Sequence, residues 1–143
     1  MSDLKTRDRE DEKWMHAAME WSRRGQGWTS PRPSVGCVLV KHGRVIGGGH
    51  TQPGHGNPHA EIGALATVRA SGGDPRGATA YVTLEPCCHF GTTPPCTRAL
   101  ISAGVARVVC GVLDPNPAVN GHGLLPLRTR NCNSWPSLTA WCC

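Results

Sequence analysis

The sequence lacks an apolar run of about 18 residues, the length that would indicate a membrane-spanning helix. It has no internal repeat or low-complexity tract, and only 17% of its 143 residues are charged. Acidic side chains crowd the N-terminus, at Asp3, Asp8, Glu10, Asp11 and Glu12, where a secretory signal peptide is basic and then apolar. These absences exclude membrane, disordered, collagen-like and coiled-coil proteins. We therefore expect a cytoplasmic globular protein with no membrane partner.

Clustered basic residues are also missing. The formal net charge is +5, yet the N-terminal lysines and arginines alternate with acids, and Arg23 and Arg24 stand alone as a pair. A protein that binds nucleic acid usually shows a basic stripe. We expect no nucleic-acid partner, and a small phosphorylated substrate fits the charge equally well.

The eight cysteines are unusual for a chain of this kind. Without a secretory signal, cysteines favour metal or catalytic thiols over disulfides. Cys37 and Cys110 lie in apolar runs, so we expect them to be small buried side chains. The remainder fall into a central group and a C-terminal group, listed as Cys87, Cys88, Cys96, Cys132, Cys142 and Cys143.

The hydrophobic pattern alternates between helical and extended periods. It predicts helices over 8–24, 59–71 and 96–103, strands over 35–40, 45–47, 77–84 and 105–113, and a flexible glycine-rich loop over 47–58. The first two strands form a hairpin, and helices connect the later ones. This order predicts an α/β protein, a three-layer α/β/α sandwich with a mixed sheet.

One imidazole and two thiols suggest a zinc site. His59, Cys87 and Cys96 have the chemistry of a tetrahedral zinc set with the fourth position open. Cys88 or His89 could also supply a fourth ligand, so the ligand count alone leaves a structural site open. Glu61 favours catalysis, because a carboxylate two residues after His59, in the first turn of a helix, can transfer protons without binding the metal.

His-x-Glu followed by Pro-Cys and a later Cys is similar to the signature of zinc-dependent nucleobase deaminases. Here eight residues separate Cys87 from Cys96, where that signature usually has two. The stretch 82–96 and the later Asp-Pro-Asn-Pro at 114–117 closely resemble the deaminase family of riboflavin biosynthesis. The resemblance extends from about Glu12 to Gly123.

This resemblance implies a cytidine-deaminase-like fold and one Zn²⁺ per chain, held by His59, Cys87 and Cys96. It implies that Glu61 moves protons during hydrolytic deamination of diaminohydroxyphosphoribosylaminopyrimidine to the corresponding aminouracil. Homo-oligomerisation is implied as well. The positions that match substrate contacts are Ala60, His50, His89, Asp114, Asn116 and Arg32.

Some positions depart from the family pattern. Thr51 stands where the family has a histidine, with His50 one residue away, and Thr92 stands where a basic residue is usual. Relatives often continue into an NADPH-dependent reductase, so we expect a separate reductase to perform the next step. We expect a deaminase domain over 1–123 and an atypical tail over 124–143, interpreted as a frameshifted or truncated gene end.

Two other functions remain open at this point. The chain could deaminate other nucleosides, nucleotides or tRNA, although that would favour the shorter cysteine spacing. It could also be a zinc-binding remnant without activity, if the tail spoils the substrate pocket.

Overall fold

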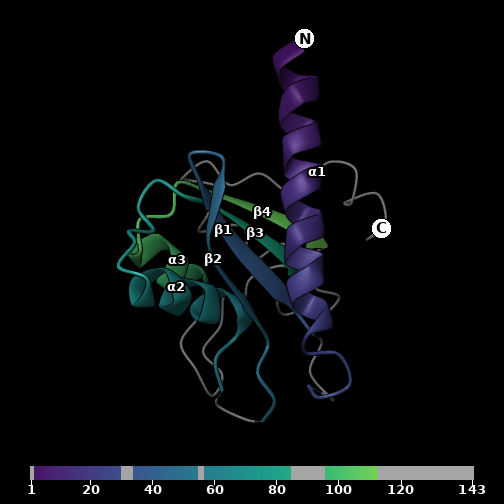
Figure 1. Cartoon of the computed structure of the whole chain (residues 1–143), viewed down its shortest axis with the longest axis vertical. Helices are drawn as coiled ribbons and strands as arrows, with labels where there is room; N and C mark the ends of the chain where they lie inside the picture. Colours follow the sequence, from purple (N-terminus) through teal and green to yellow (C-terminus); the bar gives the residue numbers. More distant parts are fainter. Residues whose placement is uncertain (1, 30–33, 55–56, 85–95, 113–143) are drawn as a thin grey trace.

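The computed structural model in Figure 1 describes residues 2–29, 34–54, 57–84 and 96–112. Within these ranges, helices and strands follow the predicted order of helix, hairpin, helix, strand, helix and strand. The elements are α1 (Ser2–Arg23), β1 (Gly36–Lys41), β2 (Arg44–His50), α2 (Ala60–Ala70), β3 (Thr79–Leu84), α3 (Cys96–Ser102) and β4 (Arg107–Val112).

The four strands form one mixed sheet in the order β2-β1-β3-β4. β1 is antiparallel to both of its neighbours, whereas β3 and β4 are parallel. His42 and Gly43 connect β1 to β2 with φ angles of 52° and 69°, the left-handed geometry of a tight two-residue hairpin turn. The predicted hairpin and mixed sheet are confirmed.

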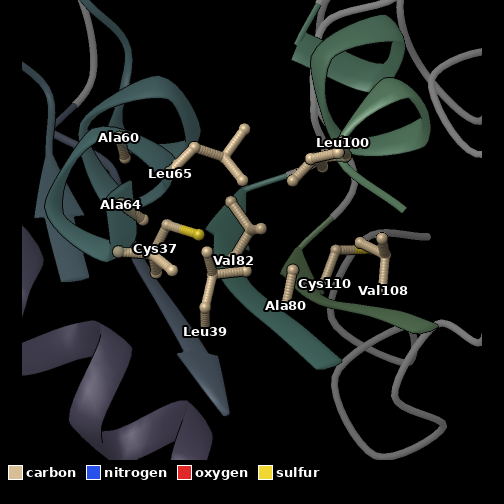
Figure 2. Packing of buried hydrophobic residues seen from close by; sticks show 12 residues of the cluster. Cys37, Leu39, Ala60, Ala64, Leu65, Ala80, Val82, Leu100, Val108 and Cys110 are labelled. Atoms are coloured by element: carbon tan, nitrogen blue, oxygen red, sulfur yellow. The ribbon is translucent and has the colours of Figure 1, made fainter. Parts of the chain in front are cut away.

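Helices cover both faces of the sheet, which confirms the predicted three-layer sandwich. On one face, Met15 and Ala18 of α1 pack against a cluster that includes Val38 and Tyr81. On the other face, α2 and α3 pack against a cluster that includes Cys37 and Cys110 (Figure 2). Successive strand residues point to opposite faces, which is why neighbours such as residues 37 and 38 belong to different clusters. Both cysteines are buried, as predicted.

The glycine-rich segment after the hairpin is only partly a loop. We expected a flexible loop from residue 47, but β2 continues through Gly47, Gly48 and Gly49 to His50. A Cβ on Gly49 would lie 2.5 Å from the backbone of α2, at Ala60 O and Ala64 N. Glycine is required here because a helix approaches the strand more closely than any side chain permits.

The first helix is longer than its apolar periodicity predicts. It begins at Ser2 rather than residue 8, and residues 5–10 are exposed. Figure 1 shows this end of α1 extending beyond the sheet. A turn that buries no face has no hydrophobic period, but its lysine, arginine and glutamate residues still favour a helix.

A buried polar cluster attaches α1 to strands β3 and β4. Arg107 of β4 donates two hydrogen bonds to the Asp11 carboxylate, Nη1 to Oδ1 at 2.8 Å and Nη2 to Oδ2 at 2.5 Å. Tyr81 of β3 donates its hydroxyl to Asp11 Oδ1 at 2.8 Å. The hydrogen bonds from Arg107 to Asp11 raise the pKa of the guanidinium above its usual value. The cluster therefore fixes the position of α1 on the sheet by directional bonds as well as by packing.

No helix among the described residues has both the length and the apolar character needed to cross a membrane. The expected domain boundary at residues 123 and 124, and the atypical tail, lie outside the described residues.

Candidate metal and catalytic site

The start of α2 presents two of the predicted site residues. His59 is the N-cap, with an extended backbone (φ −72°, ψ 167°), and its imidazole makes no capping hydrogen bond. Its carbonyl oxygen instead accepts a hydrogen bond from Gly63 N at 3.0 Å, which closes the first turn. Glu61 follows as the second residue of the helix and is 3% exposed. The helix thus anchors His59 through its backbone and directs both side chains from one turn.

The start of α3 brings a third residue to the same place. Cys96 opens this helix, is buried, and has its Sγ atom 3.2 Å from His59 Nδ1. One ligand atom from each of His59, Glu61 and Cys96 lies within 4.8 Å of the other two. The chain therefore joins residues that are 37 positions apart into one cluster.

These residues fit a zinc ion by their chemistry and spacing. Zinc in proteins prefers imidazole nitrogen and cysteine sulfur, and a tetrahedral site places two such ligand atoms about 3.5 Å apart. The distance of 3.2 Å between His59 Nδ1 and Cys96 Sγ is close to that value. The predicted third ligand, Cys87, and the alternatives Cys88 and His89 lie outside the described residues.

Glu61 is close to the two zinc-compatible side chains and lies in the first turn of α2, where the helix dipole stabilises a negative charge. The charge of Glu61 also affects the thiol of Cys37 in β1. Burial first, and then the negative charge of Glu61, raise the pKa of the Cys37 thiol well above its usual value. Cys37 therefore stays a protonated, packed side chain rather than a second thiolate near the site.

His50 is the last residue of β2, and its side chain lies on the opposite face of the sheet from α2. Because Gly49 faces α2, the alternation of β2 directs the His50 side chain towards α1. There its ring centroid is 6.3 Å from that of Trp21, and its Nδ1 donates to Thr51 O at 3.1 Å. The structure places His50 beside α1 and does not bring it into the cluster of His59, Glu61 and Cys96.

Thr51 and Ala60 both lie against the backbone of neighbouring segments. The Thr51 hydroxyl accepts a hydrogen bond from Val35 N at 2.9 Å, so it secures the start of β1. Ala60 is fully buried between α2 and β2, where its carbonyl faces Gly49. The remaining predicted substrate contacts, namely Arg32, His89, Asp114 and Asn116, lie outside the described residues.

Trp21 and Arg24 make a contact that was not predicted from the sequence. Arg24 Cζ lies 3.9 Å from the centroid of the Trp21 ring, at the C-terminal end of α1. The available signal was an aromatic residue three positions before an arginine at a helix end, a spacing that brings side chains together.

Comparison with known proteins supplies the family. The family described as "Cytidine and deoxycytidylate deaminase zinc-binding region" matches residues 8–112. The chain is 54% identical over 119 residues to riboflavin biosynthesis protein RibD of Escherichia coli, covering 83% of this chain and 31% of RibD. It therefore spans about a third of the length of that relative.

A shorter relative is covered more completely. The diaminohydroxyphosphoribosylamino-pyrimidine deaminase of Buchnera aphidicola from Acyrthosiphon pisum is 50% identical over 116 residues, covering 80% of this chain and 76% of that protein. Among solved structures, RibD of Acinetobacter baumannii superposes with a TM-score of 0.81 at 45% identity, covering 90% of this chain and 36% of that one. The similarity thus lies in both sequence and fold.

Proposed function

The chain belongs to the zinc-binding family of cytidine and deoxycytidylate deaminases, and on that premise we propose that it deaminates the diaminohydroxyphosphoribosylaminopyrimidine of riboflavin biosynthesis. The observation that carries this proposal is the cluster of His59, Glu61 and Cys96, whose ligand atoms lie within 4.8 Å of one another. The similarity to the Buchnera deaminase, most of whose length the chain covers, supports the choice of substrate.

In this proposal His59, Cys96 and Cys87 hold one zinc ion. A neutral histidine and two thiolates balance the charge of Zn²⁺ and leave one coordination position open. When bound, zinc lowers the pKa of water towards neutrality and so supplies the attacking nucleophile. The N-cap geometry of His59 and the buried start of α3 hold two of the ligands in place before the metal arrives.

Glu61 is the proton carrier. Water adds to the amino-bearing ring carbon, and Glu61 takes the proton that this addition releases. The carboxylic acid then protonates the adjacent ring nitrogen, and a second transfer through Glu61 protonates the departing amino group. The carbon–nitrogen bond breaks to give ammonia and a carbonyl group, so one water is consumed for each amine lost. The burial of Glu61 keeps bulk water from competing for these protons.

The remaining parts of the proposal concern partners and location. The substrate carries a phosphate, and the backbone at Ala60 together with Arg32, His50, His89, Asp114 and Asn116 contacts it. A separate reductase acts on the product, and the chain self-associates in the cytoplasm. The acidic N-terminus and the scattered basic residues support a small-molecule substrate rather than a membrane or nucleic acid.

The decisive experiment measures ammonia release from the riboflavin precursor, with zinc quantified in the same sample. We expect turnover by wild type, and retention of zinc with at least about a hundredfold loss of turnover for Glu61→Gln, since general acid–base groups contribute about 10²–10⁴-fold. Glu20→Gln, an exposed substitution on α1, is the matched control and should behave like wild type.

Two outcomes would replace the proposal. Faster deamination of cytidine, deoxycytidylate or a tRNA than of the riboflavin precursor would identify a different deaminase of the same family. Equal and negligible turnover by zinc-loaded wild type and Glu61→Gln would identify a zinc-binding remnant.

A further inference from the structure

One side of the first turns of α1 carries exposed charges that alternate in sign. Residues three and four positions apart lie on the same side of a helix. A set with that spacing, called here the charged flank, is fully exposed and runs positive, negative, positive, negative: Lys5, Asp8, Arg9 and Glu12. The flank lies beside the buried stripe of α1 that packs on the sheet, which includes Met15 and Ala18. It therefore faces solvent along one side of the helix.

The charged flank is unpaired within its own chain. Among the residues that the structure describes, none of its four side chains takes part in a hydrogen bond or an ion pair, whereas Glu20 and Arg23 near the other end of α1 do form one. Figure 1 shows the N-terminal end of α1 extending beyond the sheet. Helical turns that bury no face gain no stability from packing, so a partner that covered them would stabilise them.

The order of the charges makes the flank complementary to a second copy of itself. When two such helices lie antiparallel, with a two-fold axis beside the midpoint of residues 8 and 9, Lys5 of one copy meets Glu12 of the second copy. Asp8 meets Arg9 in the same way, and the two-fold axis repeats both pairs. Parallel helices in register would instead bring like charges together.

We propose that the charged flank of α1 is a dimer interface that binds a second copy of this chain in antiparallel orientation through these ion pairs. The inference rests on the self-association in the proposed function and names its surface, and deamination takes no part in it. Exposed ion pairs are screened by salt and hold long side chains at an entropic cost, so each contributes little. The dimer is therefore weak and sensitive to ionic strength.

Charge reversal at either end of the flank tests the proposal by analytical ultracentrifugation of the full chain. Lys5→Glu places a like charge opposite Glu12 of the second copy, and Glu12→Lys does the same opposite Lys5. Each variant alone should raise the dimer dissociation constant at least about tenfold, since two attractive pairs become repulsive. An equimolar mixture of the two variants should dimerise like wild type, because every pair across the mixed interface is again opposite in sign.

Two further measurements separate the interface from general effects of charge. Arg44→Glu, an exposed change on β2 with the same change in charge as Lys5→Glu, is the matched control and should dimerise like wild type. Raising the salt from about 0.1 M to about 1 M shortens the screening length from about 10 Å to about 3 Å and should dissociate the wild-type dimer. Lys5→Glu should keep the helix in circular dichroism, because an acidic residue is favourable in the first turns.

Three results would each overturn the proposal: a wild-type chain that is monomeric at low salt, single variants that dimerise like wild type, or a mixture of the variants that stays monomeric. Ammonia release from the riboflavin precursor, measured in the same samples, tests the proposed function separately. If wild type releases no ammonia while the dimer follows the expected pattern, the proposed deamination fails and the interface stands.

Discussion

The Tyr81 hydroxyl donates a hydrogen bond of 2.8 Å to the carboxylate of Asp11, and so connects the centre of the sheet to the helix that covers it. The two residues are 70 positions apart, and both are almost fully buried. This bond, together with the ion pair from Arg107, makes the docking of α1 sensitive to single polar substitutions.

Tyr81 should titrate abnormally, and it is the single tyrosine of the chain, so tyrosinate absorbance reports this residue alone. Burial first, and then the hydrogen bond and negative charge of Asp11, raise its pKa above the usual value. A raised pKa in the folded state means that the stabilisation is complete below the unfolded pKa of about 10 and is lost as the pH rises towards the folded pKa. We expect folded protein to ionise at higher pH than protein in urea. Equal titration curves would contradict this, and Tyr81→Phe should remove the ionisation step.

Removing the carboxylate of Asp11 should strongly destabilise the fold. Asp11→Ala leaves the Arg107 guanidinium largely buried without its partner, and a broken buried ion pair costs about 3 kcal/mol or more. Urea unfolding measures the loss. The exposed pair of Arg23 and Glu20 is the control, because removing it should change stability by less than about 1 kcal/mol. Equal effects for the two pairs would show that Asp11 is not buried in solution.

The close contact between β2 and α2 predicts opposite effects for two neighbouring glycines. Gly49→Ala places a Cβ 2.5 Å from Ala60 O and Ala64 N, so α2 must move, and we expect a loss of about 1–3 kcal/mol together with reduced zinc affinity. Gly63→Ala meets only Gly49 Cα at 3.5 Å, so its helix propensity should raise stability by about 0.5–1 kcal/mol. Urea unfolding and zinc titration of both variants check this. Similar stability in the two variants would contradict the close approach.

Cys37 should be unreactive in the native protein. Its thiol is fully buried, and burial together with the charge of Glu61 raises its pKa, so the reactive thiolate is suppressed on two grounds. Alkylation by iodoacetamide, located by peptide mass spectrometry, should spare Cys37 until the chain is unfolded. Rapid native labelling at neutral pH would contradict this prediction.

Several features of the fold could be predicted from local patterns. The hairpin, the burial of Cys37 and Cys110, and the placement of Glu61 in a first helical turn all follow from residue type and spacing, and the structure confirms them. These features depend on interactions within a few residues, or on burial alone.

The errors came from interactions between distant segments. Gly47–Gly49 have low strand propensity, and their pairing with β1 together with the helices that pack closely on them explains why they form a strand. The face of the sheet on which His50 lies depends on the register of the same strand. Because residues 47–50 were predicted as a loop, the face of His50 could not be predicted from the sequence. The partnership of Asp11 with Arg107 spans 96 positions and leaves no local pattern to detect.

The separation of His59 and Cys96 also has a consequence for the maturation of the protein. His59 and Cys96 are 37 positions apart and all of β3 lies between them in the chain, so we expect the imidazole and the thiol to come together only when that strand has joined the sheet. Bringing the two ends of such a segment together costs conformational entropy, and we expect the packing of the sheet to offset this cost. We therefore expect zinc binding to follow assembly of the sheet, and metal content measured along a refolding time course, beside the recovery of strand structure, tests this order.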